Sequence, residues 1–276
     1  MHTETRWRYA LPVVLVLAGV VASAQAPAGQ QPYKPTVGQP GKDAVWVPTS
    51  EALIEKMLDM AAITPKDFVM DLGSGDGRTI IAAAKRGVRA LGVEYNADLV
   101  EYSKRAAETA GVGDKASFVQ GDMYAADISK ATVLALFLLP SNLEKLAPKF
   151  LALPPGSRIV VNTFWIEGWE PDETQTLTEN CENWCTAKLF IIPAKVEGKW
   201  RLPDGELALT QKYQMVSGTY TGASGTTLQV KGRLLGDKLN LVVGDTEYEG
   251  RVDGSTIEGA PVSGDNRSTV KATRIG

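Results

Sequence analysis

Histidine is almost absent from this sequence. The one histidine, His2, lies in an N-terminal segment that resembles an export leader, so cleavage of that segment would leave none. A chain without imidazole cannot form a Ser-His-Asp triad or a histidine-ligated zinc site, and it lacks the usual general base for neutral pH. The sequence therefore excludes both classes of enzyme, and we expect no metal site.

Cysteine is also scarce. Cys181 and Cys185 are the only two, in a C-x-x-x-C spacing. They could pair in an oxidising compartment if the segment is helical or turned, because a strand would hold them too far apart. Two unpaired thiols are the alternative, and the sequence leaves both open.

Clusters of basic residues are missing as well. The chain has 29 Lys and Arg against 32 Asp and Glu, and the basic residues are scattered. No positive field therefore draws the protein to nucleic acid, and we expect no nucleic-acid partner. With 44% apolar and 22% charged residues, the composition is that of a folded protein.

The N-terminus has the pattern of a signal peptide. Arg6 and Arg8 precede the uncharged stretch 10–22, which is too short to span a membrane as a helix, and Ala22-Ser23-Ala24 offers a cleavage site. We expect a signal peptide over 1–24, a periplasmic or secreted protein, and no stable membrane insertion after cleavage. An uncleaved anchor is the alternative, and it places the folded part on the same side.

The segments that follow differ in composition and in the structure that they predict. Residues 25–44 are rich in Pro, Gly and Gln, which predicts a flexible linker. Over 45–202 a helix capped by Thr49 or Ser50 precedes repeated strand–helix units, which predict an α/β doubly wound, Rossmann-like sheet. Residues 187–196 and 198–202 are interpreted as an antiparallel pair at its edge.

The C-terminal region, residues 203–276, has a different pattern. Glycine becomes frequent and short β-rich runs replace the helical periodicity. Such runs predict a small antiparallel β domain, either a meander barrel or a sandwich. It carries no catalytic constellation, so a binding or stabilising appendage is the expected role.

A glycine bend follows the first strand of the predicted sheet. Gly73, Gly75 and Gly77 stand at alternate positions, where they can adopt positive φ and leave amides free near a helix N-terminus. Ligands of such sheets bind over the carboxyl ends of the strands. Arg78 occupies the place of the third glycine in a dinucleotide fingerprint, which argues against a dinucleotide.

These residues resemble a known superfamily. Asp71-x-Gly73-x-Gly75-x-Gly77 is similar to the first motif of class I S-adenosylmethionine (SAM) dependent methyltransferases. The longer strings 71–87 and 92–103, with 45–49 and 136–142, resemble small FAM173-type protein-lysine methyltransferases. The resemblance covers roughly residues 45–200.

The resemblance implies SAM as cofactor and a set of residues to bind it. Glu94 would accept both ribose hydroxyls, Asp122 would lie by the adenine, and Asp71 and Asp76 would shape the bend near the cationic methionine end. The alternatives are a helix-flanking charge for Glu94 and a turn cap for Asp122. The full expected set is Asp71, Gly73, Ser74, Gly75, Asp76, Gly77, Glu94, Tyr95, Asp122 and Met123.

Methyl transfer needs alignment and exclusion of water more than a base, provided that the acceptor arrives deprotonated. An amine acceptor suits a chain without histidine, and the resemblance points to protein lysine. We expect Trp46, Thr49, Pro140 and Asn142 near the transferred methyl. Trp46 could stack on a cation or serve as a hydrophobic plug, and Asn142 could instead cap the next helix.

Two other functions stay open on the sequence alone. A methyltransferase of a small molecule would need a closed pocket near Trp46. An exported binding or scaffold protein would use its C-terminal β domain and keep the Rossmann-like domain without catalysis. The intact glycine bend and Glu94 disfavour this scaffold. Against them stands the supply of cofactor, because SAM is made in the cytoplasm and the chain looks exported.

Overall fold

The structure is a computed structural model that describes residues 1–2, 33–263 and 268–275. Most of the expected signal peptide and the start of the expected linker lie outside the described residues. Within the described part, none of the helices combines the length and the apolar character that crossing a bilayer requires.

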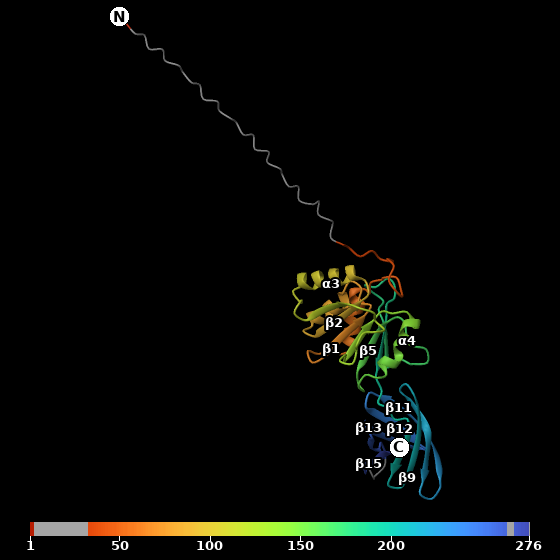
Figure 1. The fold of residues 1–276 in the computed structure, drawn as a ribbon. Coiled ribbons are helices and arrows are strands. Elements are labelled where there is room, and N and C mark those ends of the chain that lie inside the picture. The colour runs from red at the N-terminus through yellow and green to blue at the C-terminus, as the bar shows by residue number, and fades with distance from the viewer. Residues whose placement is uncertain (3–32, 264–267, 276) are drawn as a thin grey trace. The chain divides into compact units, whose positions relative to one another are not determined.

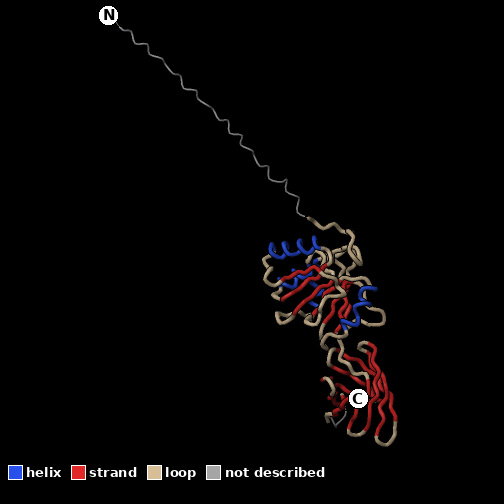
Figure 2. Tube along the Cα trace, in the orientation of Figure 1, coloured by secondary structure: helices blue, strands red, loops and turns tan. Residues whose placement is uncertain are grey.

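A seven-stranded mixed sheet forms the first half of the folded chain (Figures 1 and 2). Its order is β3-β2-β1-β4-β5-β7-β6; the first five strands are parallel, and β7 runs antiparallel to both of its neighbours, β5 and β6. This confirms the doubly wound sheet with an antiparallel edge pair. The strands are β1 (Phe68–Leu72), β2 (Arg89–Glu94), β3 (Ala116–Gln120), β4 (Val133–Leu136), β5 (Arg158–Asn162), β6 (Glu173–Thr176) and β7 (Thr186–Ile191).

Helices cover both faces of this sheet. They are α1 (Glu51–Met60), α2 (Arg78–Lys85), α3 (Ala97–Thr109) and α4 (Pro140–Phe150). One apolar core joins α1, α2 and α3 to the face that carries Val69, and a second joins α4 to the face that carries Met70. Adjacent residues of β1 thus serve opposite cores, as the alternation of a strand requires. Ser50, not Thr49, caps α1 by accepting the Leu53 N–H at 3.3 Å.

The second half is a closed eight-stranded barrel of order β10-β11-β12-β13-β14-β15-β8-β9. Of the two architectures that the sequence left open, the structure has the barrel. Its strands are β8 (Gly198–Leu202), β9 (Gly205–Lys212), β10 (Met215–Gly222), β11 (Thr227–Leu235), β12 (Lys238–Val243), β13 (Thr246–Asp253), β14 (Thr256–Pro261) and β15 (Val270–Ile275).

One edge prediction was wrong. Residues 198–202 were expected beside 187–196 at the edge of the sheet, but they form β8, which pairs with β9 and β15 in the barrel. The physical reason is Trp200, which is fully buried in the barrel core and donates its indole N–H to the Val196 carbonyl at 2.8 Å. The true edge partner of β7 is β6.

The barrel contacts the segment that leads into β6. Trp169, which is buried, stacks on the Tyr213 ring with 4.8 Å between centroids. The Gln214 amide donates to the Glu170 carbonyl at 2.6 Å, and Arg233 pairs with Asp172 at 2.7 Å. The acidic loop ahead of β6 is therefore fixed to the barrel.

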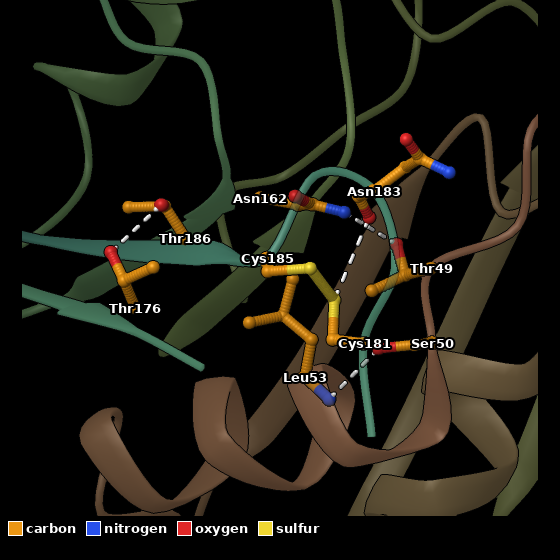
Figure 3. The surroundings of a disulfide bond; sticks show 9 residues. All are labelled: Thr49, Ser50, Leu53, Asn162, Thr176, Cys181, Asn183, Cys185 and Thr186. Carbon is orange, nitrogen blue, oxygen red and sulfur yellow. Dashed lines mark hydrogen bonds between the residues drawn. A yellow bond between two sulfur atoms is a disulfide. The ribbon is translucent and has the colours of Figure 1, made fainter. Parts of the chain in front are cut away.

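Cys181 and Cys185 form a disulfide in the loop between β6 and β7 (Figure 3). Their Cα atoms are 5.7 Å apart. Of the two alternatives left open by the sequence, the structure has the pair and not the free thiols. The same figure draws the disulfide with the start of α1 and with the hydrogen bond from Asn162 to Thr49.

Candidate functional site

The glycine bend has the geometry that the sequence predicts. Gly73, Gly75 and Gly77 have φ of 75°, 56° and 79°, in the left-handed region that favours glycine. The Gly73 and Ser74 amides donate to the Val93 carbonyl at 2.7 and 3.1 Å, which ties the bend to the end of β2. Gly77 then opens α2 as its N-cap residue.

Glu94 faces this bend from the end of β2. One carboxylate oxygen accepts the Gly75 N–H at 2.9 Å, and the other accepts the Asn96 N–H at 2.9 Å. The carboxylate thus bridges the bend and the start of α3. The side chain is held toward the bend, as a ribose-binding residue requires, rather than extending into solvent as a helix-flanking charge would.

A cavity of about 290 Å³ lies at the carboxyl ends of the parallel strands. Half of the predicted site residues line it. They include residues expected to bind the cofactor and residues expected near the transferred methyl. The lining members are Trp46, Gly73, Glu94, Tyr95, Asp122, Met123 and Asn142. The structure therefore brings the ends of β1, β2 and β3 together around one space, as strand order requires.

The other predicted residues lie outside the lining of the cavity: Thr49, Asp71, Ser74, Gly75, Asp76, Gly77 and Pro140. Gly75 is covered by the Trp46 indole, since a Cβ there would lie 2.3 Å from the indole nitrogen. The Asp76 carboxylate forms an ion pair with Arg78 at 2.6 Å, and Arg78 also donates to the Thr49 carbonyl at 3.0 Å. Asp76, Arg78 and Thr49 thus form a polar contact beside the bend and outside the cavity.

Asp71 is a buried carboxyl group behind the bend. Burial, reinforced by the charges of Glu94 and Asp76, raises its pKa to about 8, although a hydrogen bond with Thr79 opposes the shift. At neutral pH the folded protein therefore holds a proton on Asp71 that the unfolded chain releases near its ordinary pKa of 3.8.

This proton makes stability depend on pH. A carboxyl group with a raised folded-state pKa stabilises the fold below its unfolded pKa and loses that effect as pH rises through the folded value. We expect the free energy of unfolding to fall by on the order of 5 kcal/mol between about pH 4 and pH 8 through Asp71. Asp71→Asn should remove that component. Urea unfolding at several pH values checks this, and parallel pH curves for the two proteins would contradict it.

Residues 36–46 form a hydrogen-bonded loop over the cavity, here called the N-terminal loop. The Gly38 N–H donates to the Trp46 carbonyl at 2.9 Å, and the Trp46 N–H donates to the Gln39 carbonyl at 2.9 Å. The sequence predicts a flexible linker up to residue 44, because Pro and Gly are frequent there. The contacts that hold the loop come from the folded domain, and the local sequence gives no signal of them. In the structure, residues 40–47 line the cavity.

Lys42 ties the N-terminal loop to the cofactor side of the cavity. Its ammonium lies 2.6 Å from the Asp122 carboxylate and 5.1 Å from the centre of the Tyr95 ring. The hydrogen bond raises the pKa of Lys42 and lowers that of Asp122. Asp122 also accepts the Tyr124 N–H at 2.9 Å. It therefore has both the turn-capping contact that the sequence allowed and a place in the cavity.

Asn142 does not cap α4. The N-cap residue is Leu139, and Pro140 occupies the first turn, where its missing N–H is tolerated. Asn142 lies one turn inside, buried, and accepts the Tyr124 hydroxyl at 3.2 Å. Its amide nitrogen is buried without a hydrogen-bond partner in the described structure. A donor is thus available beside the cavity that Asn142 lines.

Three aromatic residues of the cavity were missed from the sequence. Phe137 follows β4, Phe164 follows β5, and Trp184 lies in the disulfide loop; all three line the cavity. The ring of Phe137 is 6.0 Å from that of Phe164 and 5.9 Å from that of Trp184. The positions of the two phenylalanines at strand ends were a usable signal, whereas nothing in the sequence placed Trp184 beside them.

Comparisons with known proteins agree with this geometry. A family model described as the ANTKMT methyltransferase domain matches residues 71–173. A protein-lysine N-methyltransferase of Saccharolobus islandicus (strain REY15A) is 41% identical over 150 residues, which cover 53% of this chain and 92% of that relative. The chain belongs to the FAM173-type class I methyltransferases.

Other similar proteins carry different descriptions. The adenine nucleotide translocase lysine N-methyltransferase of Mus musculus is 34% identical over 128 residues, or 46% of this chain and 56% of that one. A crystal structure described as an RNA methyltransferase from Salinibacter ruber, in complex with S-adenosyl-L-homocysteine, has 41% identity and a TM-score of 0.51. The match covers 54% of this methyltransferase and 96% of that chain.

The cofactor of this methyltransferase is S-adenosylmethionine, and the cavity fits it. The bend leaves no room for side chains at Gly75 and Gly77, and the Glu94 carboxylate faces it. Gly73 and Glu94 would hold the methionine and ribose parts, and Asp122 and Met123 would lie by the adenine. When bound, the cofactor supplies an activated methyl group.

Proposed function

We propose that this enzyme methylates lysine side chains of proteins outside the cytoplasm. The observation that carries the choice of acceptor is the charge of the segments around the aromatic residues of the cavity. Residues 159–187 contain six acidic side chains and no lysine or arginine, and five of the six remain once Asp172, which is paired with Arg233, is set aside. Within this stretch, Glu179 and Glu182 are exposed in the same loop as Trp184. A cationic polypeptide is the acceptor that such a surface favours.

The same charge argues against RNA as the acceptor. Nucleic-acid binding draws most of its affinity from lysine and arginine contacts to phosphates, and the exposed carboxylates of Glu179 and Glu182 beside Trp184 would repel phosphates. The relative from Saccharolobus islandicus is a protein-lysine methyltransferase, whereas the similar Salinibacter ruber structure is described as an RNA methyltransferase. The acidic charge of the Trp184 loop supports a protein acceptor.

An amine acceptor also suits the chemistry available in the cavity. Lysine must be neutral when its nitrogen bonds to the methyl carbon and the carbon–sulfur bond breaks. An apolar aromatic lining lowers the pKa of an ammonium group by desolvation, so its proton can leave to water as the side chain enters. The enzyme then needs to orient the neutral amine and exclude water, which the lining residues can do without histidine.

Export rests on two observations. The leader-like pattern at 1–24 precedes the folded part, and the disulfide between Cys181 and Cys185 is of a kind that persists in oxidising compartments. Cell fractionation with an antibody to the barrel would test the proposal. Recovery of the full-length chain in the cytoplasm alone would refute it.

The acceptor is tested with methyl-labelled SAM. Mature protein is incubated with a lysine-containing basic peptide, the same peptide with arginine in place of lysine, an RNA transcript, and free lysine. We expect label only in the lysine peptide. Label in free lysine alone would favour the small-molecule alternative, and label in the transcript would favour RNA. Calorimetry with S-adenosylhomocysteine runs alongside, because failure to bind would favour the scaffold alternative.

A further inference from the structure

The cavity has two ends of different chemistry. Glu94 and Asp122 belong to the ends of β2 and β3, whereas Phe137, Phe164 and Trp184 gather beyond β4 and β5. In the strand order of the sheet, β1 separates the two groups. The polar end suits the nucleoside of the cofactor, which leaves the aromatic end for the acceptor.

The aromatic end is assembled from three separate elements. Phe137 and Phe164 are stacked with 16° between their planes, and the Trp184 ring is inclined to Phe137 by 57°. Trp184 stays 44% exposed although it is the largest of the three. An indole that lines a cavity and still meets solvent is placed to receive a side chain from outside. A lysine ammonium can bind against such a face on entry, before it loses its proton in the desolvated interior of the cavity.

Trp184 is held in an unfavourable backbone conformation. Its φ is 54°, and Asn180, at the other end of the loop, has a φ of 58°. For a bulky residue this region costs roughly 1–2 kcal/mol, so something must hold it. The disulfide joins Cys181 and Cys185, the residues that directly follow each of these strained positions (Figure 3).

Hydrogen bonds anchor the base of this loop. The Leu177 N–H donates to the Cys185 carbonyl at 2.9 Å, and the Thr163 N–H donates to the Thr186 carbonyl at 2.6 Å. The hydroxyls of Thr176 and Thr186 are 2.9 Å apart (Figure 3). Between these contacts, the crosslink fixes the position of Trp184. The family model ends at residue 173, so this loop lies outside the matched range.

We propose that Phe137, Phe164 and Trp184 form the binding site for the acceptor lysine side chain, and that the Cys181–Cys185 disulfide positions Trp184 in it. The proposal rests on the proposed function. Its consequence is a redox dependence: a dithiol gives two electrons and two protons to the pair, leaving two thiols and an oxidised dithiol. The reduced enzyme keeps its cofactor site and loses affinity for the acceptor.

The test compares Trp184→Ala with Trp165→Ala. Trp165 is a matched control because it is 51% exposed, lies in the neighbouring loop beside Lys188, and does not line the cavity. With the lysine peptide, Trp184→Ala should raise KM about 10- to 30-fold, which is the range of a desolvated cation–π contact. Trp165→Ala should stay within about twofold of wild type. Trp184→Phe should recover part of the loss.

The disulfide is tested by dithiothreitol and by the double variant Cys181→Ser, Cys185→Ser. Reduction of the wild type should raise KM for the peptide at least about fivefold, to the level of the double variant, with little change in kcat. The double variant itself should not respond to dithiothreitol. Unchanged KM on reduction would overturn the positioning role, and equal effects of the two tryptophan variants would overturn the acceptor site.

A binding measurement separates this proposal from the proposed function. Affinity for S-adenosylhomocysteine, measured by calorimetry, should be the same for wild type, Trp184→Ala and the double variant. The probe is lysine acetylated on its α-nitrogen and amidated, so that the side-chain amine stays free. In the presence of S-adenosylhomocysteine, this probe should shift the indole N–H signal of Trp184 and not that of Trp165 in NMR spectra. A wild type that shows this shift but transfers no methyl would contradict the proposed function alone, whereas transfer without the shift would contradict the site.

Discussion

Replacing Glu94 with alanine should lower the affinity for S-adenosylhomocysteine by at least about 100-fold. The carboxylate accepts the Gly75 and Asn96 amides at 2.9 Å each and lines the cavity where the ribose would bind. Each hydrogen bond to a charged group contributes about 1.5–3 kcal/mol, so the loss of the ribose contacts alone reaches this size. The freed Gly75 amide also loosens the bend. Calorimetry on the full chain measures the change.

Two variants control this experiment. Glu94→Gln keeps the shape and one acceptor oxygen, so we expect an intermediate loss of affinity. Glu108→Ala removes an exposed carboxylate from α3 and should leave the affinity unchanged. Binding by Glu94→Ala within about threefold of wild type would mean that Glu94 does not contact the cofactor.

Gly77→Ala should lower the stability of the fold substantially, because the added methyl group would overlap its neighbours. A Cβ at Gly77 would lie 2.6 Å from the Phe118 ring and 2.8 Å from the Ser103 Cβ, and φ is +79°. The left-handed conformation costs a non-glycine residue about 1–2 kcal/mol, and overpacking adds about 1–3 kcal/mol. We expect a loss of roughly 2–5 kcal/mol in the free energy of unfolding, measured by urea.

Gly87→Ala is the matched control for this loss. Gly87 has a similar φ of +86°, but no atom lies within 4 Å of the Cβ that alanine would add. Its substitution therefore isolates the conformational cost, about 1 kcal/mol, from the overlap with Phe118. Equal losses in the free energy of unfolding for the two variants would show that Phe118 leaves room for a methyl group at Gly77.

The sheet and the bend could be predicted because their signals are local. Buried strands give continuous apolar runs, glycine spacing marks the turn, and Glu94 ends the strand that follows. Parallel topology then brings those strand ends together without further information. The cofactor side of the cavity follows from these facts, and the structure places Glu94 and Asp122 around it as expected.

The remaining features depend on contacts distant in sequence. The strand at 198–202 has no local signal that distinguishes a sheet edge from a barrel wall. Its place in the barrel depends on the burial of Trp200 among residues that are distant in sequence, such as Ala272. The N-terminal loop is ordered by Lys42 and Trp46 against the ends of β1 to β3. Trp184 reaches the cavity through the pairing of β7 with β5 and through the disulfide of its loop, and both contacts are distant from the strand-end signals.

The stack of Trp169 on Tyr213 has a consequence for the architecture of this enzyme. Trp169 precedes the edge strand of the sheet, yet one face of its ring is covered by a residue of the barrel. Cutting the chain before β8 would leave that indole bare and Asp172 without Arg233. We therefore expect the barrel to stabilise the catalytic half, so that removing residues 198–276 lowers the free energy of unfolding of the sheet domain.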